Sequence, residues 1–246
     1  AMGHTTDELI ALARQMTEAP EPRELDLLLS TGEIVSAALL SMALNHMGYR
    51  AVALSGAQAG IRTDTRHGRA RIARLDPRRI GEELEAGKIV IVAGFQGTTE
   101  EMEITTLGRG ASDTTAVALA AALKAERAEI YTDVEGIYTA DPRIEPAARK
   151  LPEISYEEML ELAAYGAKVM HPRAVELGAV FHVPIYVASS FTESPGTLIH
   201  GGPPMMEQRN KVMGIAQDKD VARITIRGVP DQPGIAATLF EPLGEA

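Results

Sequence analysis

The chain has 246 residues, 45% of them hydrophobic, and a formal net charge of −10. A chain of this length can bury one large core, or one core and part of a second. The negative charge argues against a nucleic-acid-binding protein, which usually has a basic face. The sequence contains no cysteine, which excludes disulfides, thiolate zinc sites and cysteine nucleophiles. We find no signal-peptide pattern and no apolar run of membrane-spanning length, and we therefore expect a cytoplasmic protein.

Helices and strands are predicted to alternate along the first 200 residues. The predicted helices are 31–48, 76–87, 112–123 and 155–166. The predicted strands are 50–56, 88–95, 128–133 and 183–189. The second helix has Asp76 as its cap, Pro77 at its first position and Gly87 as its stop. Ser155 and Glu158 form a capping box at the start of the fourth. The continuous apolar run 88–95 is typical of a strand covered on both faces, so the pattern predicts a three-layer α/β sandwich with a largely parallel central sheet.

The pattern changes after residue 200. Residues 1–200 are predicted to form one domain, and the glycines and prolines of 201–214 indicate a linker. Residues 215–246 begin a second unit with an alternating strand at 221–228, a turn and the start of a helix. Because one strand and half a helix cannot form a stable domain, we expect this second unit to be incomplete in the chain.

Several familiar kinds of site are missing from the sequence. It has no phosphate-binding G-x-x-x-x-G-K-[ST] loop, and the run from Gly108 begins like G-x-G-x-x-G but ends in Asp113. It has no G-x-S-x-G turn, and its six histidines show no metal-ligand spacing. The arginine-rich segment 62–79 is interpreted as a solvated or interface surface without chemistry. The remaining candidates are polar loops at strand ends, where open α/β sheets bind ligands.

The loop "TLGRGASDTTA", 106–116, predicts an anion site. Glycines on both sides of Arg109 allow backbone angles that a side chain would forbid. The residues after them are expected to form the capped first turn of a helix, whose free N–H groups favour an anion. This loop alone leaves the identity of the anion open. A second loop, "STGE" at 30–33, places Glu33 in the first turn of a helix capped by Thr31, where it either complements the helix dipole or binds a ligand.

Two further stretches carry candidate residues. The loop "YTDVEGIYTADPR", 131–143, contains Thr132, Asp133, Tyr138 and Arg143, and its alternative interpretation is a hairpin with ordinary turn residues. The stretch "YGAKVMHPRA", 165–174, puts Lys168 just after a helix, where its alternative role is to complement the helix dipole.

Together these motifs resemble one family. The segments "STGE", "AGFQGTT", "ITTLGRGASDTTA", "IYTDVEGIYTADPR", "YGAKVMHPRA" and "SSFTESPGTLI" are similar to the aspartokinase members of the amino-acid kinase family, and "GVPDQPGIAA" resembles the first turn of that family's regulatory ACT domain. The resemblance covers nearly the whole chain. It implies the amino-acid kinase fold followed by the start of a ferredoxin-like ACT domain. It also implies ATP-dependent phosphorylation of the β-carboxylate of L-aspartate, the first step of lysine, threonine and methionine biosynthesis.

The resemblance also implies roles for the candidate residues. Arg109 would pair with the α-carboxylate of aspartate, Glu33 would take the α-ammonium, and Gly110 and Ser112 would contribute nearby. Asp113, catalytic together with Arg109, would orient the cationic groups around the transferring phosphoryl group. The residues implied to hold the nucleoside or its phosphates are Thr132, Asp133, Tyr138, Arg143 and Lys168. Mg²⁺ would arrive with ATP rather than in a protein cage. A lysine or threonine effector would bind Asp231, Gln232, Pro233, Gly234, Ile235 and Ala236.

The chain departs from the family pattern in two ways. It begins after the family's first strand and its glycine-rich loop, which carries a phosphate-binding lysine, so we expect weak nucleotide binding and very poor turnover of aspartate. Ala111 stands where the family usually has glycine, and we expect its methyl group to crowd the loop. Two alternatives stay open: a non-catalytic chain that binds nucleotide or an effector, and another amino-acid kinase such as a glutamate, acetylglutamate or uridylate kinase. We expect a homo-oligomer or a pairing with a regulatory subunit, and no nucleic-acid or membrane partner; the regulating end product is left open.

Overall fold

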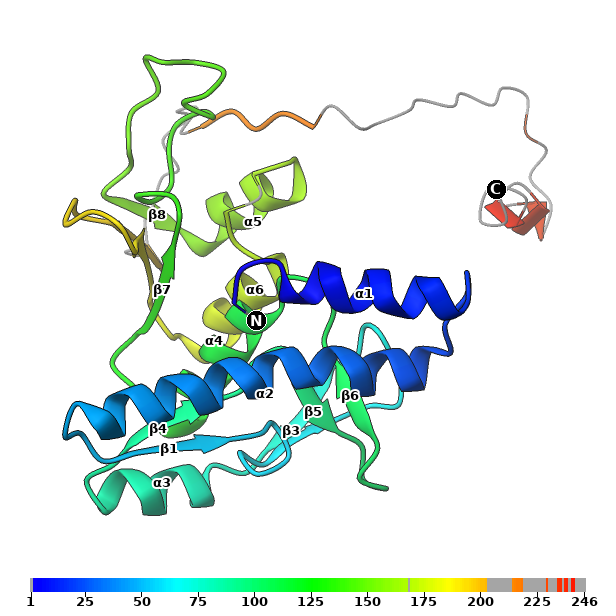
Figure 1. Ribbon diagram of the computed structural model, residues 1–246. Helices are drawn as coiled ribbons and strands as arrows, with labels where there is room; N and C mark the ends of the chain where they lie inside the picture. Colours follow the sequence, from blue (N-terminus) through cyan, green and yellow to red (C-terminus); the bar gives the residue numbers. More distant parts are fainter. Residues whose placement is uncertain are drawn as a thin grey trace.

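The computed structural model describes residues 2–167, 169–202 and 214–218, and a few positions between 229 and 241. Figure 1 shows the arrangement of its elements. The helices are α1 (Thr5–Met16), α2 (Pro22–His46), α3 (Arg78–Glu85), α4 (Ser112–Leu123), α5 (Tyr156–Ala164) and α6 (Pro172–Phe181). The strands are β1 (Ala51–Leu54), β2 (Ile61–Thr63), β3 (Ile72–Leu75), β4 (Ile89–Val92), β5 (Gln96–Thr98), β6 (Ile104–Thr106), β7 (Ala128–Thr132), β8 (Glu153–Ser155), β9 (Ile185–Ser189) and β10 (Thr197–His200).

The strands of the described part form three sheets. Strands β1 and β4 pair in parallel, and the other two sheets have the orders β3-β2-β5-β6 and β7-β9-β10-β8. The pairs β2–β5, β7–β9 and β8–β10 are also parallel, whereas β2–β3, β5–β6 and β9–β10 are antiparallel. The α/β class with mainly parallel pairing is confirmed, and the structure adds that the strands are divided among sheets.

Helix α4 lies between two hydrophobic cores. Its residues Val117 and Ala120 belong to the core built on β7, β9, α5 and α6. Its residues Leu119 and Leu123 pack against the core of the first half, around Ile61. In that half, α2 packs on β1 and β6 and lies beside α1, while α3 packs on β4 (Figure 1). The start of α4 is therefore placed at the boundary between the two halves.

The start of α2 differs from the prediction. The helix begins at Pro22, whose fixed φ suits the first turn. Thr31, expected as a cap, lies inside the helix, and its hydroxyl donates to the carbonyl of Leu28 at 2.7 Å. The prediction was wrong because Gly32 was taken as part of a loop; it is buried inside the helix, where packing outweighs the low helix propensity of glycine.

Helix α2 was also tested as a possible membrane-spanning segment. By length and composition it could cross a membrane, although we expected no such segment. Its contacts with β1, β4, β6 and α1 indicate instead a packed helix of the domain, and it buries the carboxylate of Asp26. Several apolar side chains of the helix are nevertheless exposed: Ile34, Val35, Leu39, Leu40 and Met42.

Other predictions are confirmed with small shifts. In α5 the Ser155 Oγ accepts from Glu158 N–H at 3.2 Å, and the Glu158 carboxylate accepts from Ser155 N–H at 3.0 Å. In α3 the N-cap is Pro77 rather than Asp76, whose carboxylate accepts from the N–H of Arg78. The strand expected at 221–228 and most of the linker lie outside the described residues. Strand β3 and most of β2 lie in the arginine-rich segment 62–79, for which we predicted a surface and no strand.

Candidate active site

The loop between β6 and α4 has the backbone that its glycines predicted. Gly108 has a φ of 99° and Gly110 a φ of 79°, both in the left-handed region that favours glycine. Ser112 is the first residue of α4 rather than its cap; the N-cap is Ala111, which makes no side-chain capping bond. Ala111 has a φ of −83° and is fully buried. Its methyl group is therefore accommodated in the loop, and crowding of a bound ligand by this group stays a prediction.

Two motifs that are 58 residues apart meet at the start of α4. The Asp113 carboxylate accepts a hydrogen bond from the backbone N–H of His171, the N-cap of α6, at 3.3 Å. Burial raises the pKa of the Asp113 carboxyl, and the bond from His171 opposes this only in part. Burial lowers the pKa of the His171 imidazole, with a further lowering from the charge of Arg173. The N-termini of α4 and α6 therefore converge on one partly desolvated carboxylate.

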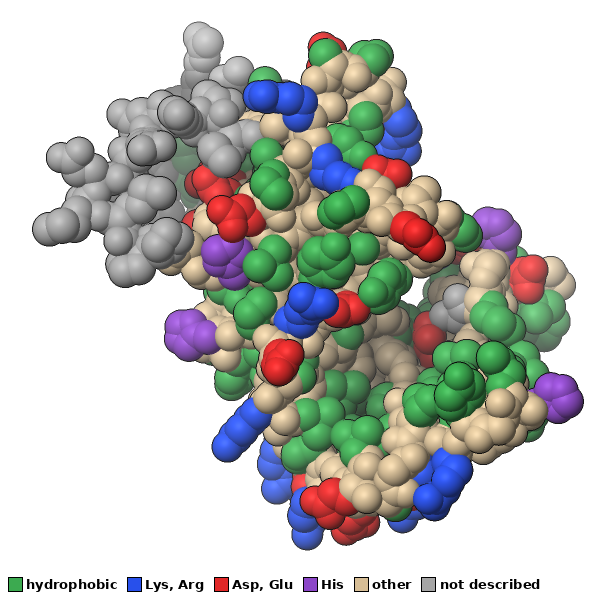
Figure 2. Space-filling view, turned by 90° about the vertical axis from the view of Figure 1, so that its left-hand side faces the viewer, with side chains coloured by type: hydrophobic (Ala, Val, Ile, Leu, Met, Phe, Trp, Pro, Cys, Tyr) green, Lys and Arg blue, Asp and Glu red, His purple; other side chains and the backbone are tan. Residues whose placement is uncertain are grey.

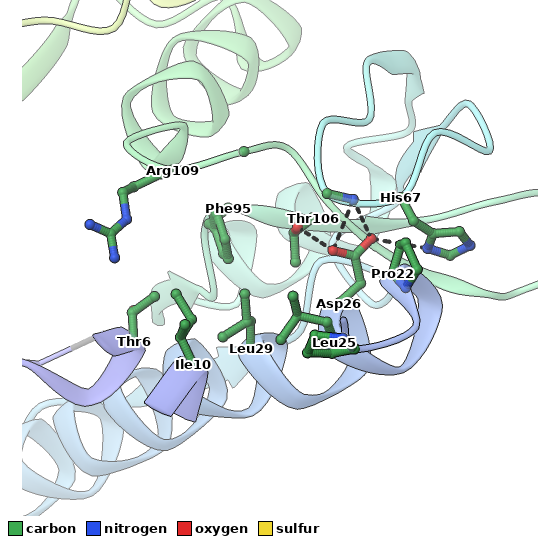
Figure 3. A pocket seen from close by; sticks show the side chains of 13 residues that line it. Thr6, Ile10, Pro22, Leu25, Asp26, Leu29, His67, Phe95, Thr106 and Arg109 are labelled. Atoms are coloured by element: carbon green, nitrogen blue, oxygen red, sulfur yellow. Dashed lines mark hydrogen bonds and ion pairs between the residues drawn. The ribbon is translucent and has the colours of Figure 1, made fainter. Parts of the chain in front are cut away.

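Arg109 extends from this loop toward α1 (Figure 3). Its guanidinium donates to the carboxylate of Asp7. Both side chains are more than half exposed, at 71% and 58%. Arg109, but not Asp7, lines one end of a pocket of about 370 Å³. The pocket is otherwise mostly apolar, and its lining includes Thr6, Ile10, Leu25, Leu29, Phe95, Gly108 and Arg109. A guanidinium at the end of an apolar pocket suits a small ligand with a carboxylate.

The other end of the pocket holds a buried carboxylate (Figure 3). The Asp26 side chain is 1% exposed. It accepts from Gly68 N–H at 2.9 and 3.0 Å and from the Thr106 hydroxyl at 2.5 Å, and its Oδ2 lies 3.0 Å from His67 Nδ1. These donors compensate for the loss of water around the charge.

The turn after β4 also reaches the start of α4. A Cβ added at Gly94 would lie 3.1 Å from the Ser112 hydroxyl, so the two backbones are close. Phe95 has a φ of 67°, a strained conformation for a residue with a side chain, and its N–H donates to the Thr115 hydroxyl at 3.1 Å. Strained residues of this kind often lie at functional sites, and this one is in the expected "AGFQGTT" motif.

Glu33 lies in the interior of α2 rather than in a first turn, which corrects its predicted setting. Its position is half-buried. Ser30, one turn earlier, accepts from the Gln96 side chain at 2.9 Å through its carbonyl, so this part of α2 packs on the start of β5. Glu33 is thus carried by the helix that also provides Asp26.

The candidate nucleotide residues lie on a separate element, the end of β7 and the loop after it. The Thr132 hydroxyl donates to Asp133 at 3.1 Å. Burial raises the pKa of the Tyr138 phenol, which lies 3.4 Å from the Glu135 carboxylate. Arg143 donates to the Asp141 carboxylate through its backbone and its guanidinium, at 2.9 to 3.1 Å, so the "DPR" segment is a turn.

Some predicted site residues lie outside the described residues. These are Lys168, Asp231, Gln232, Pro233 and Ala236. Gly234 and Ile235 are described, and the carbonyl of Gly234 accepts from Thr238 N–H at 3.2 Å, as in a helical turn. In the part of the chain that the structure describes, no group of three or more histidine or acidic residues is arranged to hold a metal ion.

Comparison with known proteins identifies the family. The model of the amino acid kinase family matches residues 1–189. The chain belongs to the amino acid kinase family. An aspartokinase from Thermus thermophilus is 57% identical over 245 residues, which is 100% of this chain and 60% of that protein. This amino acid kinase chain thus spans about 60% of the length of the relatives it matches.

Solved structures agree with this assignment. The aspartate kinase from Synechocystis matches with a TM-score of 0.71 at 50% identity, covering 85% of this chain and 34% of that one. Aspartokinase III from E. coli, in complex with aspartate and ADP, matches with a TM-score of 0.68 at 35% identity, covering 82% of this chain and 46% of that one. The predicted resemblance and the amino-acid kinase fold are confirmed.

Sequence reasoning missed several residues around the site of this amino acid kinase. Asp7, Asp26, His171 and Arg173 all contact the loop 106–113 or its neighbours. A signal was available for His171, because Pro172 follows it and proline is common at the first position of a helix. Asp26 and Arg173 gave no signal, because their partners lie more than 40 residues away in the sequence.

Proposed function

We propose that the chain carries the site of an aspartate kinase, which transfers the γ-phosphoryl group of ATP to the β-carboxylate of L-aspartate and forms 4-phospho-L-aspartate. The observation that carries the proposal is the setting of Arg109. Arg109 lies just before α4, between two glycines with positive φ. Its guanidinium already binds a carboxylate, that of Asp7. Similarity to E. coli aspartokinase III, solved with aspartate and ADP, supports the choice of substrates.

The substrate is held by charge complementarity. Arg109 binds the α-carboxylate in place of Asp7, because the planar guanidinium matches a carboxylate with two parallel hydrogen bonds. Glu33 of α2 takes the α-ammonium, and Gly110 and Ser112 contribute from the start of α4, whose free N–H groups favour an anion. Asp113 then lies where the N-termini of α4 and α6 converge. There it orients the cationic groups around the transferring phosphoryl group.

The nucleotide is held by the loop after β7. Thr132, Asp133 and Tyr138 hold the nucleoside, and Arg143 and Lys168 reach the phosphates. Mg²⁺ enters with the nucleotide and neutralises phosphate charge.

The chemistry requires positioning rather than a protein nucleophile. A carboxylate is already ionised at neutral pH, so the β-carboxylate of aspartate attacks the γ-phosphorus without a strong base. The phosphorus–oxygen bond to ADP breaks as the new bond forms, and the protein aligns the two substrates and stabilises the charge on the phosphoryl oxygens.

The proposed organisation follows the family. Residues 1–200 form the kinase domain, 201–214 the linker and 215–246 the start of an ACT domain. A lysine or threonine effector binds at Asp231–Ala236 once that domain is complete, in a cytoplasmic homo-oligomer or in a complex with a regulatory subunit.

The acceptor is tested directly. The protein is incubated with Mg²⁺, ATP and hydroxylamine, which traps acyl phosphates as hydroxamates, and with one acceptor at a time: L-aspartate, L-glutamate or N-acetylglutamate. In parallel, the release of ADP is measured with UMP as the acceptor. In line with the very poor turnover expected from the sequence, we expect hydroxamate to form slowly with aspartate, and at least tenfold less product with each other acceptor. Preference for another acceptor assigns a different kinase, and binding of ATP without transfer to any acceptor supports a non-catalytic role; either result overturns the proposal.

A further inference from the structure

The backbone that leads into the loop of Arg109 is paired with a second segment of the chain. Residues 67–70 and 106–108 lie side by side, joined by a hydrogen bond from Ala70 N–H to the Thr106 carbonyl at 2.9 Å. A Cβ added at Gly108 would lie 3.5 Å from the Gly68 carbonyl, which is ordinary van der Waals contact. Ala70, Thr106 and Leu107 are at most 1% exposed. The position of Arg109 therefore depends on what holds this pair of segments.

Asp26 of α2 binds both segments from the first half of the molecule. Its carboxylate accepts from Gly68 N–H in one segment and from the Thr106 hydroxyl in the other. Figure 3 shows these bonds converging on the buried side chain, with His67 beside it. Because a buried carboxylate with unsatisfied oxygens is costly, Asp26 favours the one arrangement in which both segments supply donors.

Arg173 of α6 binds the same segments from the second half of the molecule. Its guanidinium donates to the Leu107 carbonyl at 2.7 Å and to the Ala70 carbonyl at 2.9 Å. These carbonyls belong to buried residues, and burial also lowers the pKa of Arg173. A fixed guanidinium fork can bind two carbonyls at once, which a lysine ammonium does less well.

The loop beyond these contacts is short and has little stiffness of its own. Only Gly108 separates Leu107 from Arg109, and Gly110 follows, so the backbone around Arg109 is the most permissive in the site. At its other end the loop enters α4 at the buried Ala111. The direction of Arg109 is thus set by the anchors at Leu107 and Ala111.

We infer that Asp26 and Arg173 are positioning residues that hold segments 67–70 and 106–108 from opposite sides and thereby aim Arg109 at the substrate carboxylate. The inference rests on the proposed function, because the effect is measured on aspartate. Neither residue touches substrate in this account. Since Arg173 is close to His171, whose N–H binds Asp113, the same helix start holds both the arginine loop and the catalytic carboxylate.

The test compares Arg173→Met, Arg173→Lys and Asp26→Asn with the unchanged protein, using the KM for aspartate, the KM for ATP, kcat and Tm. We expect Arg173→Met and Asp26→Asn to raise the aspartate KM roughly tenfold, because small displacements of a binding group are costly. The ATP KM should change less than twofold. Arg173→Lys should recover part of the loss, because an ammonium can still bind one carbonyl. Arg127→Met is the matched control, since Arg127 is an exposed arginine that pairs with Glu129 on β7.

A second comparison separates positioning from general stability. If Arg173 acts through Arg109, then Arg173→Met should add nothing to the aspartate KM when Arg109 is already alanine. Additive effects, equal rises in both KM values, or an unchanged aspartate KM in Arg173→Met would each overturn the inference. If the unchanged protein forms no aspartyl hydroxamate, the proposed function fails instead, and the two failures are thus distinguished.

Discussion

Asp7 binds the guanidinium of Arg109, which we propose binds the substrate carboxylate. Its carboxylate lies in the first turn of α1 and pairs with Arg109 at the end of the pocket. Under this proposal the substrate carboxylate displaces Asp7, so we expect Asp7→Asn to lower the aspartate KM. Because both side chains are more than half exposed, the pair is worth about 0.2–1 kcal/mol, which limits the effect to at most about fivefold.

The matched control is Glu8→Gln, which removes the same charge one residue along α1. The aspartate KM is measured for both variants at low and high salt, and the ATP KM is measured beside it. An equal fall of the aspartate KM in both variants would mean that α1 acts through its general negative field rather than through Asp7. A higher KM in Asp7→Asn would mean that Asp7 assists binding.

The ionised carboxylate of Asp113 is expected to lower the stability of the protein, although the proposed activity requires it. Burial raises the pKa of its carboxyl, so the folded state disfavours the ionised form. Ionised Asp113 therefore destabilises the protein above its folded pKa, and this cost disappears below the unfolded value of about 3.9. We expect Asp113→Asn to raise Tm at pH 7, with the gain shrinking as the pH falls toward 4.

The same variant should lose activity by about 10²-fold, a typical cost of removing one preorganised polar group from an active site. The amide oxygen of the substituted side chain can still accept the bond from His171 N–H, so a drop in activity would not report a lost helix contact. Thermal melts at several pH values and single-substrate kinetics provide the measurements. A lower Tm at pH 7 would show that the ionised carboxylate is a net stabilising group.

At the scale of elements, the loop after β7 is expected to bind phosphate through Arg143. Its guanidinium pairs with Asp141 but is 89% exposed, so it can leave this carboxylate for a ligand at little cost. We expect Arg143→Gln to weaken ATP binding severalfold and to leave adenosine binding unchanged, because only ATP offers anionic oxygens. Titration calorimetry with both ligands measures this. Equal losses for ATP and adenosine would mean that Arg143 supports the turn without contacting phosphate.

The helix ends show which features can be predicted from local sequence. The capping box of α5 and the stop of α3 were predicted correctly, because each depends on residues within one turn of the helix. The start of α2 was misplaced because Gly32 is stabilised inside a helix by packing that local propensity does not contain. Short strands such as β5, with three buried residues, leave too few positions for a periodic pattern.

At the scale of the whole molecule, sequence reasoning gave the α/β class and the loop that begins α4. It did not give the division into two cores with α4 between them, because that depends on which strands pair. It also missed the contacts of Asp26 and Arg173, which connect positions up to 103 residues apart. Figure 2 shows hydrophobic side chains on both sides of a hollow between the upper and lower parts of the molecule.

The central claim is that Arg109 selects the substrate through its carboxylate. The most direct measurement is the kinetics of Arg109→Ala with aspartate and ATP varied separately. Removing one partner of a hydrogen-bonded charge pair that the bound substrate buries costs roughly 2–5 kcal/mol. We therefore expect kcat/KM for aspartate to fall at least about 30-fold while the ATP KM stays within twofold. Equal losses for both substrates, or unchanged use of aspartate, would contradict it.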